Sequence, residues 1–216
     1  MYYLLIAATL ITGIWAAHVA LLQAPADAMQ GNVQRVFYFH VPLVWVSFLA
    51  FIGGAVMSVR YLKSRNLQHD AWARAFIKTG WAFTTTVLVT GPLWASPVWG
   101  VFWNWGDERL VSFFVMWMMY NGYLLLRATI NDAEKAARIG AILSLLALLN
   151  AVLVVAAIYI WKTASHPVPV FVQKAGSGVM DPLMRRAFWG NFSAFTLLFI
   201  SLLVARYRVE KTQTEL

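Results

Sequence analysis

Residues 94–109 read WASPVWGVFWNWGDER and hold a dense group of aromatic side chains. Four tryptophans fall within twelve positions: Trp94, Trp99, Trp103 and Trp105. An indole ring buries a large flat surface and keeps one N–H donor, so such a group outside a core suits either the membrane interface or a flat ligand. The stretch ends in three charged residues: Asp107, Glu108 and Arg109. It is too polar and too broken to continue an apolar span, which predicts a loop.

Two of the four histidines lie at the edges of apolar runs, where an imidazole can reach a ligand. His40 lies in RVFYFHVP, and Pro42 suits the first turn of a helix, because the N–H that proline lacks has no partner there. His166 lies in TASHPVP, just beyond another apolar run. Neutral imidazole is a common metal ligand. His18, within the first apolar run, is expected to be satisfied inside a bundle, and His69, in a basic segment, to be solvated.

The composition identifies a membrane protein. Of the 216 residues, 61% are hydrophobic and 12% are charged, which leaves too few polar side chains for a water-facing shell. The net charge of +8 comes from short basic clusters between apolar runs, and orientation in a bilayer explains these better than nucleic-acid binding does. The absence of cysteine excludes a thiolate metal site, a disulfide and a thiol nucleophile.

Six apolar runs approach the roughly 20 residues that a membrane-spanning helix needs. They cover residues 3–22, 36–59, 76–93, 110–126, 139–161 and 188–205. Polar or charged connections separate them, at residues 23–34, 60–74, 94–109, 127–138 and 162–186. The sequence therefore predicts an all-α membrane protein, a bundle of six transmembrane helices that forms a single domain over residues 1–216. Its tryptophan-rich loop lies between the third and fourth helices.

The distribution of lysine and arginine predicts the orientation, because the more positive side of a membrane protein faces the cytoplasm. Eleven of the 17 lie on the side of the second and fourth connections and the C-terminus: Arg60, Lys63, Arg65, Arg74, Lys78, Arg127, Lys135, Arg138, Arg206, Arg208 and Lys211. The other side has Arg35, Arg109, Lys162, Lys174, Arg185 and Arg186. Both termini are therefore predicted to be cytoplasmic. His40, His166 and the tryptophan loop then share the outer face.

Two imidazoles from different loops on one face can hold a planar macrocycle between them, since neutral imidazole is a good axial ligand for haem iron. The tryptophans would form an aromatic shelf beside it, and Arg35 or Arg109 could pair with a haem propionate. Simpler interpretations stay open: interfacial histidines, a membrane belt of tryptophans, Arg35 ending a span, and Arg109 paired with Asp107 or Glu108. Asp107 either orients an indole N–H or the loop backbone, or is solvated.

On these residues the chain resembles the CcmC family, within the WWD superfamily of haem-handling membrane proteins that includes CcmF and CcsA. The resemblance rests on the tryptophan-rich run, the six spans and one outward histidine on each side of the loop. Further matches are QGN at 30–32, Arg35 with HVP at 40–42, Trp-Gly at 99–100, and DP followed by MR at 181–185. The resemblance covers nearly the whole chain.

The resemblance implies a role in cytochrome c maturation, with His40 and His166 as the axial ligands of haem b. The exposed haem edge would lie on the signature loop, through Trp94, Trp99, Trp103, Trp105 and Asp107. Arg35 and Arg109 match arginines of the family pattern. Haem would be held at the periplasmic face of the inner membrane and passed to the chaperone CcmE, which bonds covalently to a haem vinyl group. The implied partners are the CcmA ATPase, CcmB and the small CcmD.

The sequence departs from the family pattern at two positions. Gly106 intervenes between Trp105 and Asp107, whereas in the family the tryptophan directly precedes the aspartate. The spacing from Asp107 to Arg109 is kept, so Asp107 is assigned to the acidic position, with Glu108 as the competitor. Phe102 stands where a third tryptophan often stands, which keeps the aromatic surface and removes an N–H donor.

Two other functions compete with haem delivery. A structural, permease-like transporter subunit that binds no haem would use the same loop as a membrane belt. An electron-transfer cytochrome would ligate haem inside the bilayer from facing helices, and the spans offer only His18 at depth. The sequence shows no nucleophile and no acid–base pair, and it leaves open whether haem transfer counts as catalysis, since positioning alone can promote a bond.

Overall fold

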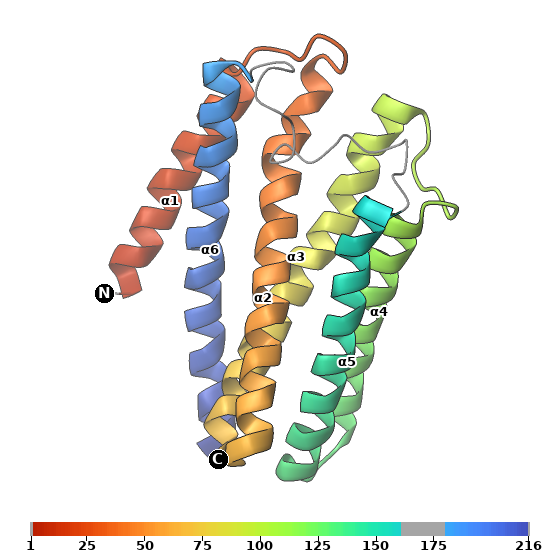
Figure 1. The fold of residues 1–216 in the computed structure, drawn as a ribbon. Coiled ribbons are helices and arrows are strands. Elements are labelled where there is room, and N and C mark those ends of the chain that lie inside the picture. The colour runs from red at the N-terminus through yellow and green to blue at the C-terminus, as the bar shows by residue number, and fades with distance from the viewer. Residues whose placement is uncertain (1, 161–179, 216) are drawn as a thin grey trace.

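The helices of the chain are continuous and long. A computed structural model describes residues 2–160 and 180–215, and Figure 1 shows its helices crossing the bundle in alternating directions. They are α1 (Tyr2–His18), α2 (Phe37–Ser64), α3 (Leu67–Trp99), α4 (Glu108–Thr129), α5 (Ala133–Ile160) and α6 (Pro182–Glu215). A π-helical turn, Val19–Gln23, extends α1, and a 3₁₀ turn, Asn32–Val36, leads into α2. The predicted all-α bundle of six helices is confirmed.

Five helical stretches are long and apolar enough to cross a membrane: Tyr2–Gln23, Asn32–Ser64, Glu108–Thr129, Ala133–Ala156 and Pro182–Gln213. The remaining helix, α3, is long but more polar, since it carries a run of threonines at 84–86 and charged side chains in its first half. Of its polar residues, Asp70, Thr79 and Thr84 are buried against neighbouring helices.

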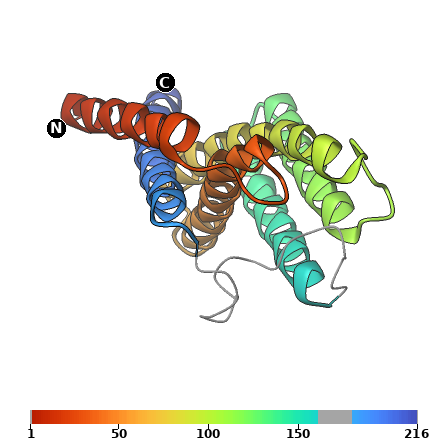
Figure 2. The same ribbon diagram turned by 90° about the horizontal axis from the view of Figure 1, so that it is seen from above.

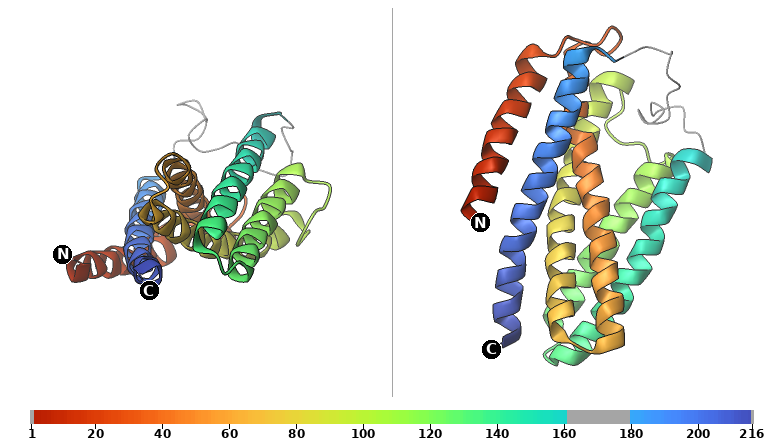
Figure 3. Two further views of the ribbon diagram at one scale, coloured as in Figure 1. Left: turned by 90° about the horizontal axis from the view of Figure 1, so that it is seen from below. Right: turned by 60° about the vertical axis from the view of Figure 1, so that its left-hand side comes forward.

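The centre of the bundle is the pair α2 and α3, with α6 packed on both, α5 packed on α2 and α4, and α1 packed on α6. Figures 2 and 3 show α1 at one edge and the pair α4 and α5 at the other. Glycines let α2 and α3 approach closely. A Cβ added to Gly54 would lie 2.9 Å from Ile77, and one added to Gly80 would lie 2.7 Å from the Cβ of Ala50. Small residues at such crossings are typical of helix packing in membranes.

Several predicted connections prove to be helical. Within the basic segment 60–74, only a two-residue turn is not helical. Arg65 ends α2 in a left-handed conformation (φ 55°), and the side chain of Asn66 caps α3 by accepting from the N–H of Gln68. Helix α3 continues through Trp94 to Trp99, and the expectation of a loop from Trp94 is wrong for this part. Gly100, with φ of 72°, then ends the helix by donating its N–H to the carbonyl of Ser96 at 2.9 Å. Residues 182–186 belong to α6.

Candidate functional site

The candidate ligand residues of the described chain gather at one end of the bundle. Helix α2 begins there with His40 in its first turns, and α3 ends there at Trp99 (Figure 1). His166 lies outside the described residues. The end of α5 and the start of α6, which flank that segment in sequence, both lie at the same end of the bundle as the start of α2.

The imidazole of His40 is oriented by a threonine of the neighbouring helix. Its Nδ1 lies 2.8 Å from Oγ1 of Thr90. That hydroxyl has one proton, and it donates this proton to the carbonyl of Thr86 one turn earlier in α3, at 2.9 Å. A hydroxyl that donates to Thr86 can accept from Nδ1 of His40, and in that tautomer the lone pair of the imidazole lies on Nε2. This is the arrangement found around metal-binding histidines, whose second ring N–H is held by a neighbouring acceptor.

One tryptophan of α3 lies beside this imidazole, and a second packs on the first. The ring centroids of His40 and Trp94 are 5.9 Å apart at an interplanar angle of 61°, and those of Trp94 and Trp99 are also 5.9 Å apart. Trp94 is 3% exposed, and its Nε1 donates to Oε1 of Gln30 at 3.0 Å. Gly91 leaves room for the imidazole, because a Cβ there would lie 3.3 Å from Cε1 of His40.

The other two tryptophans lie in the connection between α3 and α4. Trp103 and Trp105 have ring centroids 5.5 Å apart, and both pack edge-on against Phe114 of α4. Together with Phe102 and Trp117 they line a hollow of about 430 Å³ whose walls are almost entirely apolar. Within the described chain, Nε1 of Trp103 is buried and has no hydrogen-bond partner.

The four tryptophans therefore form two pairs on different faces of α3. Thr90 and Trp94 face His40, whereas the residues of α3 that line the hollow are Thr85, Leu88, Val89 and Pro92. With 3.6 residues per turn, these two sets point in nearly opposite directions. The expected aromatic shelf is divided accordingly, with Trp94 beside His40 and the pair Trp103 and Trp105 beyond the far side of the helix.

Asp107 and Arg109 shape the start of α4. Asp107 is buried, and its side chain accepts from the backbone N–H groups of Arg109 and Leu110, at 3.1 and 3.2 Å, as an N-cap. Its second oxygen pairs with Arg109 Nη2 at 3.0 Å. Glu108 is exposed, so Asp107 is the carboxylate that orders this loop. The Nη1 group of Arg109 is buried and has no hydrogen-bond partner among residues 2–160 and 180–215.

Arg35 closes the turn that follows α1. Its Nη1 donates to the carbonyl of Leu21, and its Nη2 donates to the carbonyl of Ala24 at 3.1 Å. These carbonyls belong to the end of the π-helical turn, where the backbone lacks helical partners. The guanidinium is thus held at the same end of the bundle as His40 by backbone contacts, and its Nε is buried without a partner in the described part of the chain.

The remaining two histidines lie elsewhere. His69 is in the first turns of α3 at the opposite end, where its Nδ1 lies 2.8 Å from Oγ of Ser64. His18 is the last residue of α1 and is exposed on the protein surface, so the expectation that it is enclosed in the bundle is wrong. Helix α1 packs on α6, and its other faces are left uncovered by the described chain.

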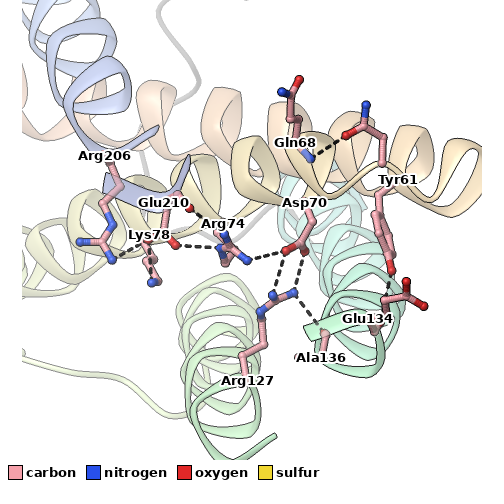
Figure 4. A network of polar contacts seen from close by, with 11 residues as sticks. Tyr61, Gln68, Asp70, Arg74, Lys78, Arg127, Glu134, Ala136, Arg206 and Glu210 are labelled. Carbon is pink, nitrogen blue, oxygen red and sulfur yellow. Dashed lines mark hydrogen bonds and ion pairs between the residues drawn. The ribbon is translucent and has the colours of Figure 1, made fainter. Parts of the chain in front are cut away.

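Sequence reasoning did not anticipate a buried group of charges at the opposite end of the bundle. We call it the ionic network: Asp70, Arg74, Lys78, Arg127, Arg206 and Glu210. Arg74 bridges the two carboxylates, at 2.6 Å to Asp70 and 2.7 Å to Glu210. Figure 4 shows the contacts running from Arg206 through Glu210 and Arg74 to Asp70 and Arg127. The i, i+4 spacings of Asp70 with Arg74 and of Arg206 with Glu210 were visible in the sequence, and they are the signal that could have indicated it.

Comparisons with known proteins identify relatives of this chain. The family model described as heme exporter protein C matches residues 1–216. A protein of Bradyrhizobium diazoefficiens with that name is 34% identical over 192 residues, which are 87% of this chain and 70% of the relative. The protein of the same name from Escherichia coli K12 is 34% identical over 193 residues, which are 86% of this chain and 73% of the relative. A Marchantia polymorpha protein named as a putative cytochrome c biosynthesis ccmC-like mitochondrial protein is 32% identical over 152 residues, 70% of this chain and 64% of the relative.

Proposed function

Since this chain belongs to the heme exporter protein C family, we propose that it binds haem at the His40 end of the bundle and delivers it to a CcmE-like chaperone during cytochrome c maturation. The observation that carries the proposal is the hydrogen bond between His40 Nδ1 and Thr90. With Nδ1 as its donor, a neutral imidazole has its lone pair on Nε2, which is the state that ligates haem iron. Haem b is the cargo in this account.

The iron would be bound between His40 and His166. The support for the second ligand is that the described helix ends on both sides of the 161–179 segment lie at the His40 end of the bundle. Two imidazoles constrain the iron and leave the porphyrin edge to the surrounding side chains. Such a site holds haem firmly and still presents an edge to a partner.

The two tryptophan pairs would have different roles. Trp94 lies beside the imidazole and Trp99 packs on Trp94, and both would offer ring surface to the bound porphyrin. Trp103 and Trp105 line the apolar hollow across α3, and Trp105 is 68% exposed. An exposed aromatic surface of this kind suits contact with a partner protein. We assign it to docking of the chaperone as it reaches a haem vinyl group.

The charged residues of this end would bind the propionates and order the loop. Arg109 is anchored through Nη2 to Asp107, and its buried Nη1 has no partner among the described residues. A carboxylate accepting from that nitrogen would satisfy it. Arg35 is held by two backbone carbonyls and would contribute through its positive charge. Asp107 acts indirectly, by capping α4 and fixing Arg109.

The chain is a multi-pass membrane protein, and we infer that it lies in the cytoplasmic membrane with both termini inside. Arg35 precedes α2 and Arg109 lies in the first turn of α4, whereas Asp70, Arg74 and Lys78 of the ionic network lie in the first half of α3. The excess of lysine and arginine on the side of the network supports cytoplasmic termini. The haem end would then face the periplasm. Its assembly with CcmA, CcmB and CcmD subunits is part of the same proposal.

Haem absorbance distinguishes this function from a structural transporter subunit. The full-length protein purified in detergent should show a Soret band, and the double variant His40→Ala/His166→Ala should lose it. His69→Ala is the matched control, because that histidine lies at the opposite end. A double variant with undiminished haem would overturn the proposal, and a colourless wild-type protein that also fails to bind added haem would favour the structural subunit.

A further inference from the structure

A second cavity lies at the end of the bundle opposite His40. It has a volume of about 540 Å³ and lies between α3, α4 and α6. Its wall includes Lys78, Trp81 and Ala82 of α3, Leu124 of α4, and Leu202 and Arg206 of α6. The wall is mostly apolar, and the two cations lie where the cavity meets the ionic network. The cavity is therefore amphipathic, with a long apolar part and a cationic part.

The polar side chains of this cavity have N–H groups that the described hydrogen bonds do not use. Lys78 Nζ donates to Glu210 at 2.7 Å and Arg206 Nη2 donates to the same carboxylate oxygen at 2.6 Å. A protonated lysine has three N–H groups and an arginine has five, so these contacts use a minority of them. Nε of Arg206 and Nε1 of Trp81 are both buried, and neither has a partner within residues 2–160 and 180–215.

The ionic network carries an excess of positive charge. It has four cations, Arg74, Lys78, Arg127 and Arg206, and two carboxylates, Asp70 and Glu210, which gives 4 − 2 = +2. Glu210 is fully buried and is shared by three of the cations. Among the described residues of the network the cations outnumber the carboxylates, so an anion at its edge would be attracted to it.

We propose that this cavity is a binding site for one anionic phospholipid. The phosphate would accept hydrogen bonds from Lys78 and Arg206, and an acyl chain would lie along Ala82, Leu124 and Leu202. The indole N–H of Trp81 would donate to a glycerol ester carbonyl, the level at which tryptophan is commonly found in membranes. The bound lipid would complete the contact of α4 with α3 and α6, beside the pair of Arg127 and Asp70.

Native mass spectrometry of the delipidated full-length protein tests the site. Added phosphatidylglycerol should bind as one retained molecule, about thirtyfold more tightly than phosphatidylcholine, because each of the two basic residues near the headgroup favours an anionic lipid by about 1 kcal/mol. Equal retention of the two lipids would overturn the proposal. So would displacement of phosphatidylglycerol by added haem, since haem also combines carboxylates with an apolar ring and would then be the preferred occupant.

Two variants locate the lipid. Ala82→Phe fills the apolar wall without touching a charge and should abolish the retained molecule, whereas Ala128→Phe, at an exposed position of α4, should leave it. Arg206→Gln should reduce the preference for phosphatidylglycerol, and Arg138→Gln, an exposed arginine of α5, should not. Retention that survives Ala82→Phe would contradict the assignment even if Arg206→Gln fails to fold.

Discussion

The two ends of the bundle differ in the exposure of their side chains: one exposes aromatic rings, and the other buries paired charges. At the His40 end, Phe102 is 61% exposed and Trp105 is 68% exposed. At the other end, Asp70 is 2% exposed and Glu210 is fully buried, and each carboxylate accepts from at least two cations. A buried carboxylate without partners is costly, and both carboxylates of that end are paired. The His40 end keeps uncovered aromatic surface, which suits it to contact a ligand.

This contrast indicates that one end of the bundle stabilises the fold and the other binds the ligand. The ionic network joins α3, α4 and α6, so it fixes the frame from one end. The packing of these helices in turn determines the positions of His40 on α2 and Thr90 on α3 at the other end. Substitutions in the network should therefore affect folding first, and substitutions beside His40 should affect haem first.

The largest expected effect is that of Glu210→Ala. It would leave Arg74, Lys78 and Arg206 without their shared carboxylate, and breaking such a buried group costs about 3 kcal/mol or more. We expect a large fall in the midpoint of thermal unfolding, measured in detergent by loss of the monodisperse peak. Glu134→Ala is the control, because Glu134 is exposed. Equal midpoints for the two variants would show that the network does not stabilise the frame.

Thr90→Val should weaken haem binding without unfolding the protein. It removes the acceptor that orients His40, and loss of such an outer contact typically costs about tenfold or more in affinity. A haem titration followed at the Soret band measures the change. Thr90→Ser should restore affinity, and Thr86→Val, one turn away on an exposed position, should leave it unchanged. If Thr90→Val binds haem as the wild type does, Thr90 does not orient His40 for binding.

The double variant Trp103→Ala/Trp105→Ala should separate holding haem from transferring it. These rings line the hollow across α3 from His40, so iron ligation should be spared. Transfer to the chaperone should slow about fivefold, in line with about 1 kcal/mol for lost aromatic contacts. The measurement is the rate of covalent chaperone loading at matched haem occupancy. An unchanged rate would remove the docking role of this pair.

Gly91→Ala should have the smallest effect. The added Cβ would lie 3.3 Å from Cε1 of His40, so the imidazole must turn by a small angle. An off-minimum side-chain angle costs about 0.5 kcal/mol, which corresponds to about a twofold weaker haem affinity. The same titration detects it. Gly122→Ala, on α4 with open space around the added Cβ, should be silent.

Hydrophobicity predicted the number and order of the helices, since an apolar run of about 20 residues has few other stable structures in a membrane. Their ends were less predictable. The basic residues of 60–74 suggested a solvated loop, whereas Asp70 and Arg74 lie buried on α3 and pair with other helices. A charge that finds its partner far away in sequence leaves no local signal of burial.

The same limit applies to the candidate site. The sequence indicated His40 and Trp94, which the fold brings into contact, yet it gave no sign of Thr90, because the contact joins two helices. It also predicted one aromatic shelf. The continuation of α3 to Trp99 divides that shelf. Trp94 lies on the face of α3 that meets His40, whereas Trp103 follows the helix and packs against Phe114 of α4. The prediction that His18 is enclosed was wrong because α1 is apolar on every face, so its sequence does not show which face packs against the bundle.

The spin state of bound ferric haem tests the central claim most directly. Two imidazole ligands give a low-spin spectrum, which electron paramagnetic resonance of the purified full-length protein detects. We predict a low-spin signal for the wild type and for His69→Ala, and its loss, with or without loss of the haem, in His40→Ala. A His40→Ala variant with the wild-type low-spin signal at full haem occupancy would contradict the account, because another residue would then hold the iron.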